Sequence, residues 1–275
     1  MWEEFTKVND LYIKTAGAAL NIDDFNHIAI TAHSTQIEGS TLTLDEAKNL
    51  IDNGLSSGGK KHSHHDMVLD HHEALTFVLA AAKEKRKITP DFIKEIAAKV
   101  MHRTGIIVNS VSGNTDETKG DYRKVMVTAG KAYFMNFDKV PGSVNALAES
   151  LQERIAIAST VEDIHALAFA AHYDLVNIHP FSDGNGRVSR LLMNFIQAYH
   201  NQPLTVVRAE YKIAYFEALQ KSTDEENLDA IVTFLRSQHT NWLKELQIKY
   251  EAAMNQPQIN KRSGLGLTSS LFFLQ

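Results

Sequence analysis

Three features of the sequence predict a mainly α-helical fold, a bundle of helices with one small β-hairpin. Only 5 prolines and 14 glycines interrupt the 275 residues, and both residue types disfavour helices. Most segments repeat apolar residues every three or four positions, which is the spacing of one helix face. A single stretch near residue 130 resembles two short strands around a glycine turn.

The expected helices follow from this periodicity and from end signals. Pro90 stands directly behind Thr89, so a helix should begin there, because proline fits the first helical position. Thr160 and Asp163 form a weak capping box before a later helix. In chain order, the expected helices span residues 43–51, 67–83, 90–100, 161–175, 187–200, 211–221 and 227–250.

The remaining segments are expected to be a hairpin, a loop and a tail. The hairpin pairs residues 124–128 with 132–135, and Gly130 lies in its turn. Residues 56–65 read as a flexible loop, and residues 256–275 as a weakly patterned tail after Pro257. Since no repeat and no linker divides the chain, we expect a single domain over residues 1–275.

Composition excludes several classes of function. The formal net charge is -5, so a basic surface that would bind a phosphate backbone, and with it a nucleic-acid partner, is not expected. The chain has no cysteine, which excludes disulfides, thiolate metal sites and a cysteine nucleophile. No apolar run approaches the ~20 residues that cross a membrane, and the acidic N-terminus is unlike a secretory signal. We therefore expect a cytoplasmic protein without a membrane partner; a homo-oligomer stays open.

The stretch of residues 179–190, HPFSDGNGRVSR, concentrates chemically useful residues. Pro180 disfavours a helical conformation at His179 and so ends the preceding helix. The following Asp183-Gly184-Asn185-Gly186 is typical of a turn, and a helical pattern starts directly after it. The loop should therefore present free backbone N–H groups at a helix N-terminus, which is a binding site for phosphates.

Charged and titratable side chains flank this phosphate site. Arg187 and Arg190 share one face of the first helical turn, where their guanidinium groups can hold phosphate oxygens. Asp183 offers an oxygen ligand of the kind that Mg²⁺ prefers, and His179 offers a base. Together they indicate nucleotide-dependent transfer to a hydroxyl. The alternative is a glycine turn that merely starts a helix, with solvated arginines and a histidine at a helix end.

This stretch matches the signature HPFx(D/E)GNGRxxR of the Fic (Fic/Doc) family at every defined position, so the chain resembles that family. Residues 120–123, the hairpin and Pro141 resemble the family's flap, here about 120–141, and similar elements run from Phe25 to Phe234. The resemblance implies a Fic-type helical bundle. It also implies transfer of AMP from ATP to a Ser, Thr or Tyr hydroxyl of a protein target that the flap holds.

The resemblance further implies a role for each position of the loop. His179 would deprotonate the target hydroxyl, and Asp183 would hold Mg²⁺ between the α- and β-phosphates. Phe181 would anchor the loop in the core. The nucleotide would be bound by glycines, arginines, an asparagine and one tyrosine near the base: Gly184, Asn185, Gly186, Arg187, Arg190 and Tyr215.

An upstream segment, residues 25–39, resembles the inhibitory element of the same family. Ser34, Glu38 and Gly39 match its motif (S/T)xxxE(G/N). In the family this glutamate pairs with the second signature arginine, which is Arg190 here, and removes a contact for the γ-phosphate. The alternative interpretation is a solvated helix that ends at Gly39.

The sequence therefore predicts an autoinhibited protein adenylyltransferase that uses ATP and Mg²⁺. Three alternatives remain: removal of AMP, with Glu38 orienting a water; a different nucleotide or a phosphocholine donor; and a non-catalytic nucleotide-binding module. A histidine-rich segment suggests a transition-metal site, but without firm ligand spacing we expect a solvated loop and helix start. Its histidines are His62, His64, His65, His71 and His72.

Overall fold

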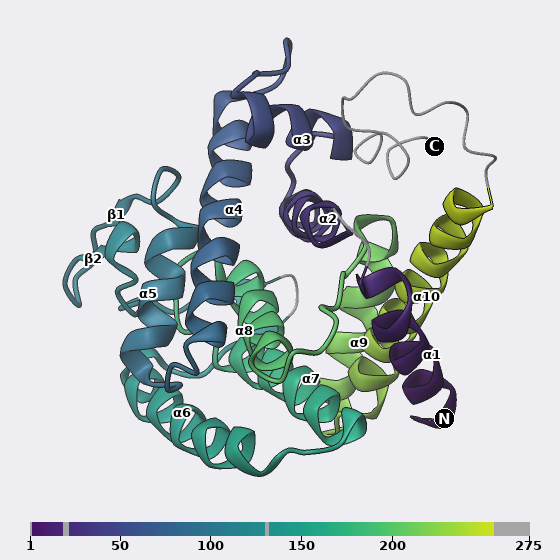
Figure 1. The fold of residues 1–275 in the computed structure, drawn as a ribbon. Coiled ribbons are helices and arrows are strands. Elements are labelled where there is room, and N and C mark those ends of the chain that lie inside the picture. The colour runs from purple at the N-terminus through teal and green to yellow at the C-terminus, as the bar shows by residue number, and fades with distance from the viewer. Residues whose placement is uncertain (1, 19–21, 130–131, 256–275) are drawn as a thin grey trace.

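The computed structural model describes residues 2–18, 22–129 and 132–255 and confirms the mainly helical fold (Figure 1). Within these residues the chain forms ten α-helices. They are α1 (Trp2–Lys14), α2 (Ile22–Ile37), α3 (Leu44–Asn53), α4 (His62–Lys83), α5 (Pro90–Val100), α6 (Val140–Ile157), α7 (Val161–Ile178), α8 (Asn185–Tyr199), α9 (Lys212–Asp224) and α10 (Asp229–Met254).

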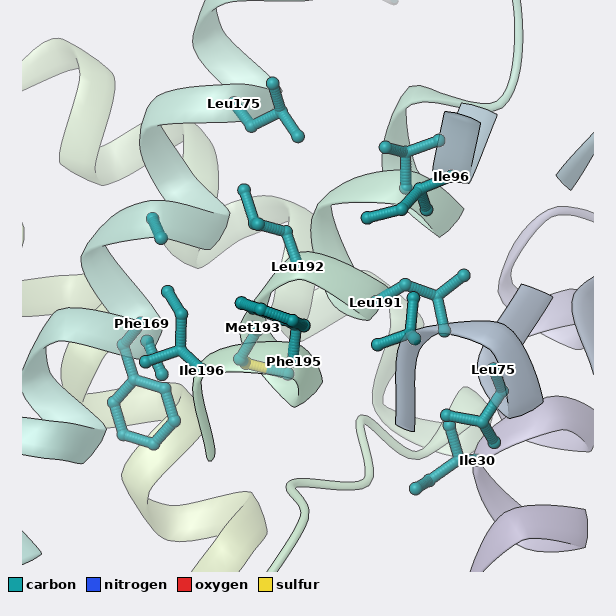
Figure 2. Close-up of a cluster of buried hydrophobic side chains, with 14 of the residues drawn as sticks. Ile30, Leu75, Ile96, Phe169, Leu175, Leu191, Leu192, Met193, Phe195 and Ile196 are labelled. Atoms are coloured by element: carbon teal, nitrogen blue, oxygen red, sulfur yellow. The ribbon is translucent and has the colours of Figure 1, made fainter. Parts of the chain in front are cut away.

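Helix α8 lies at the centre of the bundle and contacts α4, α5 and α7 (Figure 1). Apolar side chains leave it in several directions, as expected for a helix surrounded by others. Leu191 points toward Leu75 of α4, whereas Ile196 points toward Phe169 of α7 (Figure 2). The helix that follows the signature loop is therefore held from several sides, and the loop rests on a fixed base.

Two helices, α1 and α6, were missing from the prediction, and α2 was expected only in the alternative interpretation, as a helix that ends at Gly39. Helix α6 begins at Val140, with Pro141 in its first turn, so the stretch assigned to the flap ends where a helix starts. The helical spacing was nevertheless present in the sequence, since Val144, Leu147, Leu151 and Ile155 form its buried face.

Two threonines begin the predicted helices where the sequence indicated. Thr160 and Asp163 form the expected capping box, and the Thr89 hydroxyl accepts the Phe92 N–H at 3.1 Å, directly before Pro90. Thr43, predicted inside a helix, instead caps α3 from outside in a second capping box. These caps fix the helix starts because they satisfy N–H groups that have no partner within the helix.

The prediction for the histidine-rich segment was partly wrong. Helix α4 starts at His62 rather than at residue 67, so much of the expected loop is helical. His65 and His71 are buried, not solvated. His65 accepts the Ser57 N–H at 3.1 Å and therefore ties the preceding loop to the helix. In the described residues, no group of three or more histidine, aspartate or glutamate side chains could hold a metal ion.

The expected hairpin is present but short. Strand β3 (Thr128–Ala129) pairs antiparallel with β4 (Ala132–Tyr133), with Thr128 opposite Tyr133. Its predicted turn at Gly130 and Lys131, like the predicted tail at 256–275, lies outside the described residues. A second two-stranded sheet was not predicted; it joins β1 (Ile107–Val108) to β2 (Thr115–Asp116). Two-residue strands leave almost no periodicity to detect.

Across the described residues, none of the helices combines the length and the apolar character needed to cross a membrane.

The first prediction concerns the central helix. Leu191→Ala should lower the free energy of unfolding by ~2–5 kcal/mol, because it opens a cavity between α8, α4 and α2. Leu11→Ala is the matched control, since Leu11 is 48% exposed and its truncation should cost less than about 0.5 kcal/mol. Urea unfolding measures both, and equal losses for the two variants would contradict the central position of α8.

Candidate active site

The signature loop connects α7 to α8 through two residues in the left-handed region. His179 follows the last residue of α7 with φ 51° and ψ 60°, and Pro180 prevents the helix from continuing. Gly184 has φ 80° and directly precedes α8. A side chain at Gly184 would also approach the Met101 Sδ atom, so the turn needs glycine there.

Asn185 braces this loop from inside. Its Oδ1 accepts the Phe181 N–H at 2.9 Å, and its Nδ2 donates to the Phe181 carbonyl at 2.8 Å. The Phe181 ring is buried, as an anchor of the loop should be. The Asn185 side chain therefore holds the loop together, and its backbone N–H, in the first turn of α8, is the group left for the predicted phosphate contact.

His179 is placed to accept a proton. Its Nδ1 lies 3.2 Å from the Val176 carbonyl, which can only accept, so Nδ1 carries the proton in the neutral ring and Nε2 has a free lone pair. The Phe134 ring stacks on the imidazole at a centroid distance of 3.8 Å. Burial lowers the pKa of His179 to about 4, despite the hydrogen bond to Val176 that raises it. The imidazole is therefore neutral at pH 7.

Asp183 is the exposed carboxylate of the loop. Its side chain is 67% exposed, its Oδ1 accepts the Gly184 N–H at 2.5 Å, and its Oδ2 lies 3.5 Å from Arg187 Nη2. Mg²⁺ is commonly held by one or two carboxylates together with substrate phosphates. A single open carboxylate next to a helix N-terminus fits that arrangement.

Arg187 is buried but poorly bonded. Its Nη1 donates to the Val100 carbonyl at 3.4 Å, its Nη2 lies 3.3 Å from the Met101 Sδ atom, and its Nε has no partner among the described residues. A buried donor without a partner is rare and costly. The Arg187 guanidinium therefore has unused donors at the N-terminus of α8.

Arg190 connects α8 to the predicted inhibitory segment at the end of α2. Its Nε donates to the Ser34 Oγ at 2.9 Å, and its Nη2 donates to the Ser34 carbonyl at 3.0 Å and to Glu38 Oε1 at 2.6 Å. The structure thus brings together residues 152 positions apart, as the motif predicted. Ser34 contributes two of the three contacts, a role that the motif did not specify.

Glu38 lies directly against the turn that is predicted to bind phosphates. The alpha carbon of Gly186 touches it so closely that a Cβ at this position would overlap Glu38 Oε1. Burial raises the pKa of Glu38, but the charge and hydrogen bond of Arg190 outweigh it, so the net pKa is lowered. The carboxyl is therefore ionised at neutral pH, and the pair is lost only as the pH falls below the ordinary carboxyl range. Gly39, with φ 102°, follows and ends the segment.

Tyr215 was predicted near the nucleotide base, but its side chain is only 1% exposed. Its hydroxyl lies 2.7 Å from His172 Nε2 and 3.5 Å from Arg190 Nη1. Burial lowers the pKa of His172 to about 3, so this imidazole is neutral and shares a hydrogen bond with the Tyr215 hydroxyl. In this structure Tyr215 therefore supports Arg190 and offers no open face to a base; sequence reasoning did not identify His172 as its partner.

Comparison with known proteins identifies relatives of this chain. The Fic/DOC family model matches residues 87–197. The protein adenylyltransferase Fic of Drosophila persimilis is 32% identical over 216 residues, which cover 77% of this chain but 38% of that protein. The same protein of Drosophila erecta is 30% identical over 213 residues, with 77% and 39% covered. The chain therefore spans about two fifths of the length of these relatives.

A solved structure shares the fold over almost the whole chain. A Fic domain containing signaling protein from Bacteroides thetaiotaomicron superposes with a TM-score of 0.77 at 21% identity, covering 91% of this chain and 97% of that one. The signature at 179–190 falls within the matched family region. By the family model and the sequence relatives, this chain belongs to the Fic/DOC family.

Proposed function

We propose that this chain is an autoinhibited protein adenylyltransferase that transfers AMP from ATP, with Mg²⁺, to a Ser, Thr or Tyr hydroxyl of a protein target. The name of the Drosophila relatives, protein adenylyltransferase, supports the reaction class. The observation that carries the proposal is the arrangement of three groups around one helix N-terminus: the neutral His179, the exposed Asp183 and the Arg190–Glu38 pair.

In the proposed reaction, the target hydroxyl attacks the α-phosphorus while His179 Nε2 accepts its proton, and pyrophosphate leaves. A pKa of about 4 makes His179 a weak base. Phosphoryl-type transfer needs little basicity, because most of its catalysis comes from positioning and charge stabilisation. The imidazole then acts chiefly by holding the hydroxyl in line.

The first turn of α8 would bind the phosphates. The N–H groups of Asn185, Gly186 and Arg187 have no acceptor within the helix, and the helix dipole favours an anion there. The Arg187 guanidinium, whose Nε has no partner among the described residues, would also favour a bound phosphate. Bound Mg²⁺ would neutralise phosphate charge, and Asp183 is the residue that would hold it.

Inhibition follows from competition for Arg190. Glu38 occupies its Nη2 at 2.6 Å and lies against Gly186, where a phosphate would have to approach the backbone. A carboxylate and a phosphate oxygen use the same donors of a guanidinium, so both cannot be bound at once. A displacement of ~1 Å at the α-phosphorus can cost about 10²-fold in rate.

A second function, removal of AMP from a modified protein, is favoured by one observation. Only Oε1 of Glu38 has a hydrogen-bond partner among the described residues, and the side chain is 28% exposed. The free Oε2 can accept a hydrogen bond from a water and orient it toward a phosphodiester. A non-catalytic nucleotide-binding module is disfavoured, because it would have no use for a neutral His179 beside an open Asp183.

Glu38→Gly should increase AMP incorporation from ATP into the chain itself and into lysate proteins by about 10-fold or more, since it frees Arg190. Arg190→Ala in the same background should cancel the gain. Glu3→Gly is the matched control, because Glu3 pairs only with Lys7 on the surface. If Glu38→Gly transfers no faster than wild type while binding ATP equally, inhibition is ruled out; if it loses AMP removal, the second function takes precedence.

His179→Ala in the Glu38→Gly background should lower the rate of AMP transfer by ~10²–10⁴-fold, the usual loss for a proton acceptor. ATP affinity should change less than about twofold, because the imidazole lies at the far end of the loop from the arginines. The measurements are radiolabel incorporation and calorimetric ATP binding. Unchanged transfer would remove His179 from the mechanism.

Asp183→Ala in the Glu38→Gly background should make transfer slow and insensitive to Mg²⁺ concentration, because one carboxylate would hold the metal. Asp66→Ala serves as the control, since Asp66 interacts with His62 on another face of the chain. A Mg²⁺ titration of the rate tests this. Full recovery of Asp183→Ala at the Mg²⁺ concentration that saturates the parent would show that another group binds the metal.

A further inference from the structure

Arg123 joins the flap to the signature loop through four hydrogen bonds. Its Nη1 donates to the Val125 carbonyl at 2.9 Å, before β3, and its Nη2 donates to the Met135 carbonyl at 2.6 Å, after β4. Its Nε donates to the His179 carbonyl at 2.7 Å, and its backbone N–H to the Pro180 carbonyl at 2.9 Å. One planar group thus binds the chain on both sides of the β3–β4 hairpin and at the start of the signature loop.

The charge of Arg123 has an unusual environment. The side chain is only 1% exposed, and no carboxylate of the described residues pairs with it. Burial lowers the pKa of its guanidinium, which records the cost of removing this cation from water. Backbone carbonyls alone compensate it. Apolar residues could fill the same volume without that cost, so its specific geometry matters more than its bulk.

A second contact links the same two parts one residue away. Phe134 precedes Met135 and stacks on the His179 ring at 3.8 Å. The flap is therefore attached to the backbone of His179 through Arg123 and to its imidazole through Phe134. The separation between the flap edge and His179 Nε2 depends on both contacts.

We propose that Arg123 is a positioning residue for AMP transfer, which sets the distance between the target segment held along the flap and the base His179. A target segment that binds along the flap edge through main-chain hydrogen bonds is placed by that edge, so its distance from His179 depends on where the edge lies. The rigid guanidinium fork holds three carbonyls in fixed directions, which a flexible ammonium cannot do. This inference rests on the proposed function, because AMP transfer is the reaction that Arg123 would serve. The attachment of the flap to the signature loop by Arg123 can be tested without activity.

The decisive variant is Arg123→Lys, made in the Glu38→Gly background. Lysine keeps the positive charge but cannot hold three carbonyls in one plane. We expect kcat for AMP incorporation into lysate proteins to fall by about 10–100-fold, as for a ~1 Å misplacement, with ATP affinity unchanged within about twofold. Arg208→Lys is the matched control, because Arg208 is also a buried arginine but pairs with Glu245 away from the loop.

Two readouts do not depend on activity. Hydrogen exchange of peptides covering residues 124–129 and 132–136 should be at least about 10-fold faster in Arg123→Lys, because the ends of the flap are released. The His179 imidazole, followed by NMR, should titrate at a higher pH than the parent, since Phe134 no longer covers it. Of the other charges that act on His179, Glu38 and Asp183 raise its pKa and Arg123 lowers it. In the Glu38→Gly background Glu38 is absent from parent and variant alike, Asp183 is present in both, and lysine retains the charge of Arg123.

Phe134→Ala separates the two contacts. It should raise the pKa of His179 but leave exchange of the flap ends as in the parent, because Arg123 is intact. If Arg123→Lys fails to fold, Arg123→Gln removes the buried charge and is judged by flap exchange alone.

The outcomes separate this inference from the proposed function. Faster flap exchange together with slower transfer in Arg123→Lys, but not in Arg208→Lys, supports the inference. Parental flap exchange and parental transfer overturn it. If even the Glu38→Gly parent transfers no AMP, the proposed function fails, whereas flap exchange and the His179 titration still decide whether Arg123 holds the flap to the loop.

Discussion

The contact between Arg190 and the end of α2 is the interaction on which the arrangement of the site depends. Arg190 extends from the buried face of α8, and its Nε and Nη2 donors bind Ser34 and Glu38. A buried cation of this kind must be compensated, and removing Glu38, its one carboxylate partner among the described residues, leaves it to neutral partners or to an incoming anion. In the proposed function, the same requirement that packs α2 onto the core would make the site receptive to phosphate once Glu38 is displaced.

Two buried arginines, Arg123 and Arg190, bind at the two ends of the stretch 179–190, and their hydrogen-bond acceptors are of different kinds. Arg123 is compensated by carbonyls of Val125, Met135 and His179, which belong to the backbone and cannot be exchanged. Arg190 is compensated partly by Glu38, a side chain that a phosphate can replace. In the proposed reaction the first arginine therefore fixes geometry, and the second responds to ligand.

The local features of the site could be predicted from sequence, whereas most long-range contacts could not. Residues 179–190 encode their own turn, because Pro180, Gly184 and the helix that follows act within a few positions. The Arg190–Glu38 contact was predicted only because both residues lie in recognisable motifs. Arg123 donates to backbone carbonyls, and because every residue has one, the sequence does not indicate which of them it contacts. Tyr215 was expected at the base, and only the packing of α7 against α8 and α9 shows that it faces His172.

The Glu38–Arg190 pair is asymmetric, and that asymmetry indicates how it can open. Arg190 is 3% exposed and bonded at Nε as well as Nη2, whereas Glu38 is 28% exposed and bonded through one oxygen. Breaking the pair by moving Arg190 would also cost its two contacts with Ser34. Moving Glu38 costs one hydrogen bond and takes the carboxylate toward water, where its charge is stable. Glu38 also lies beyond the last residue of α2, just before Gly39, so it can swing out without unwinding the helix that carries Ser34.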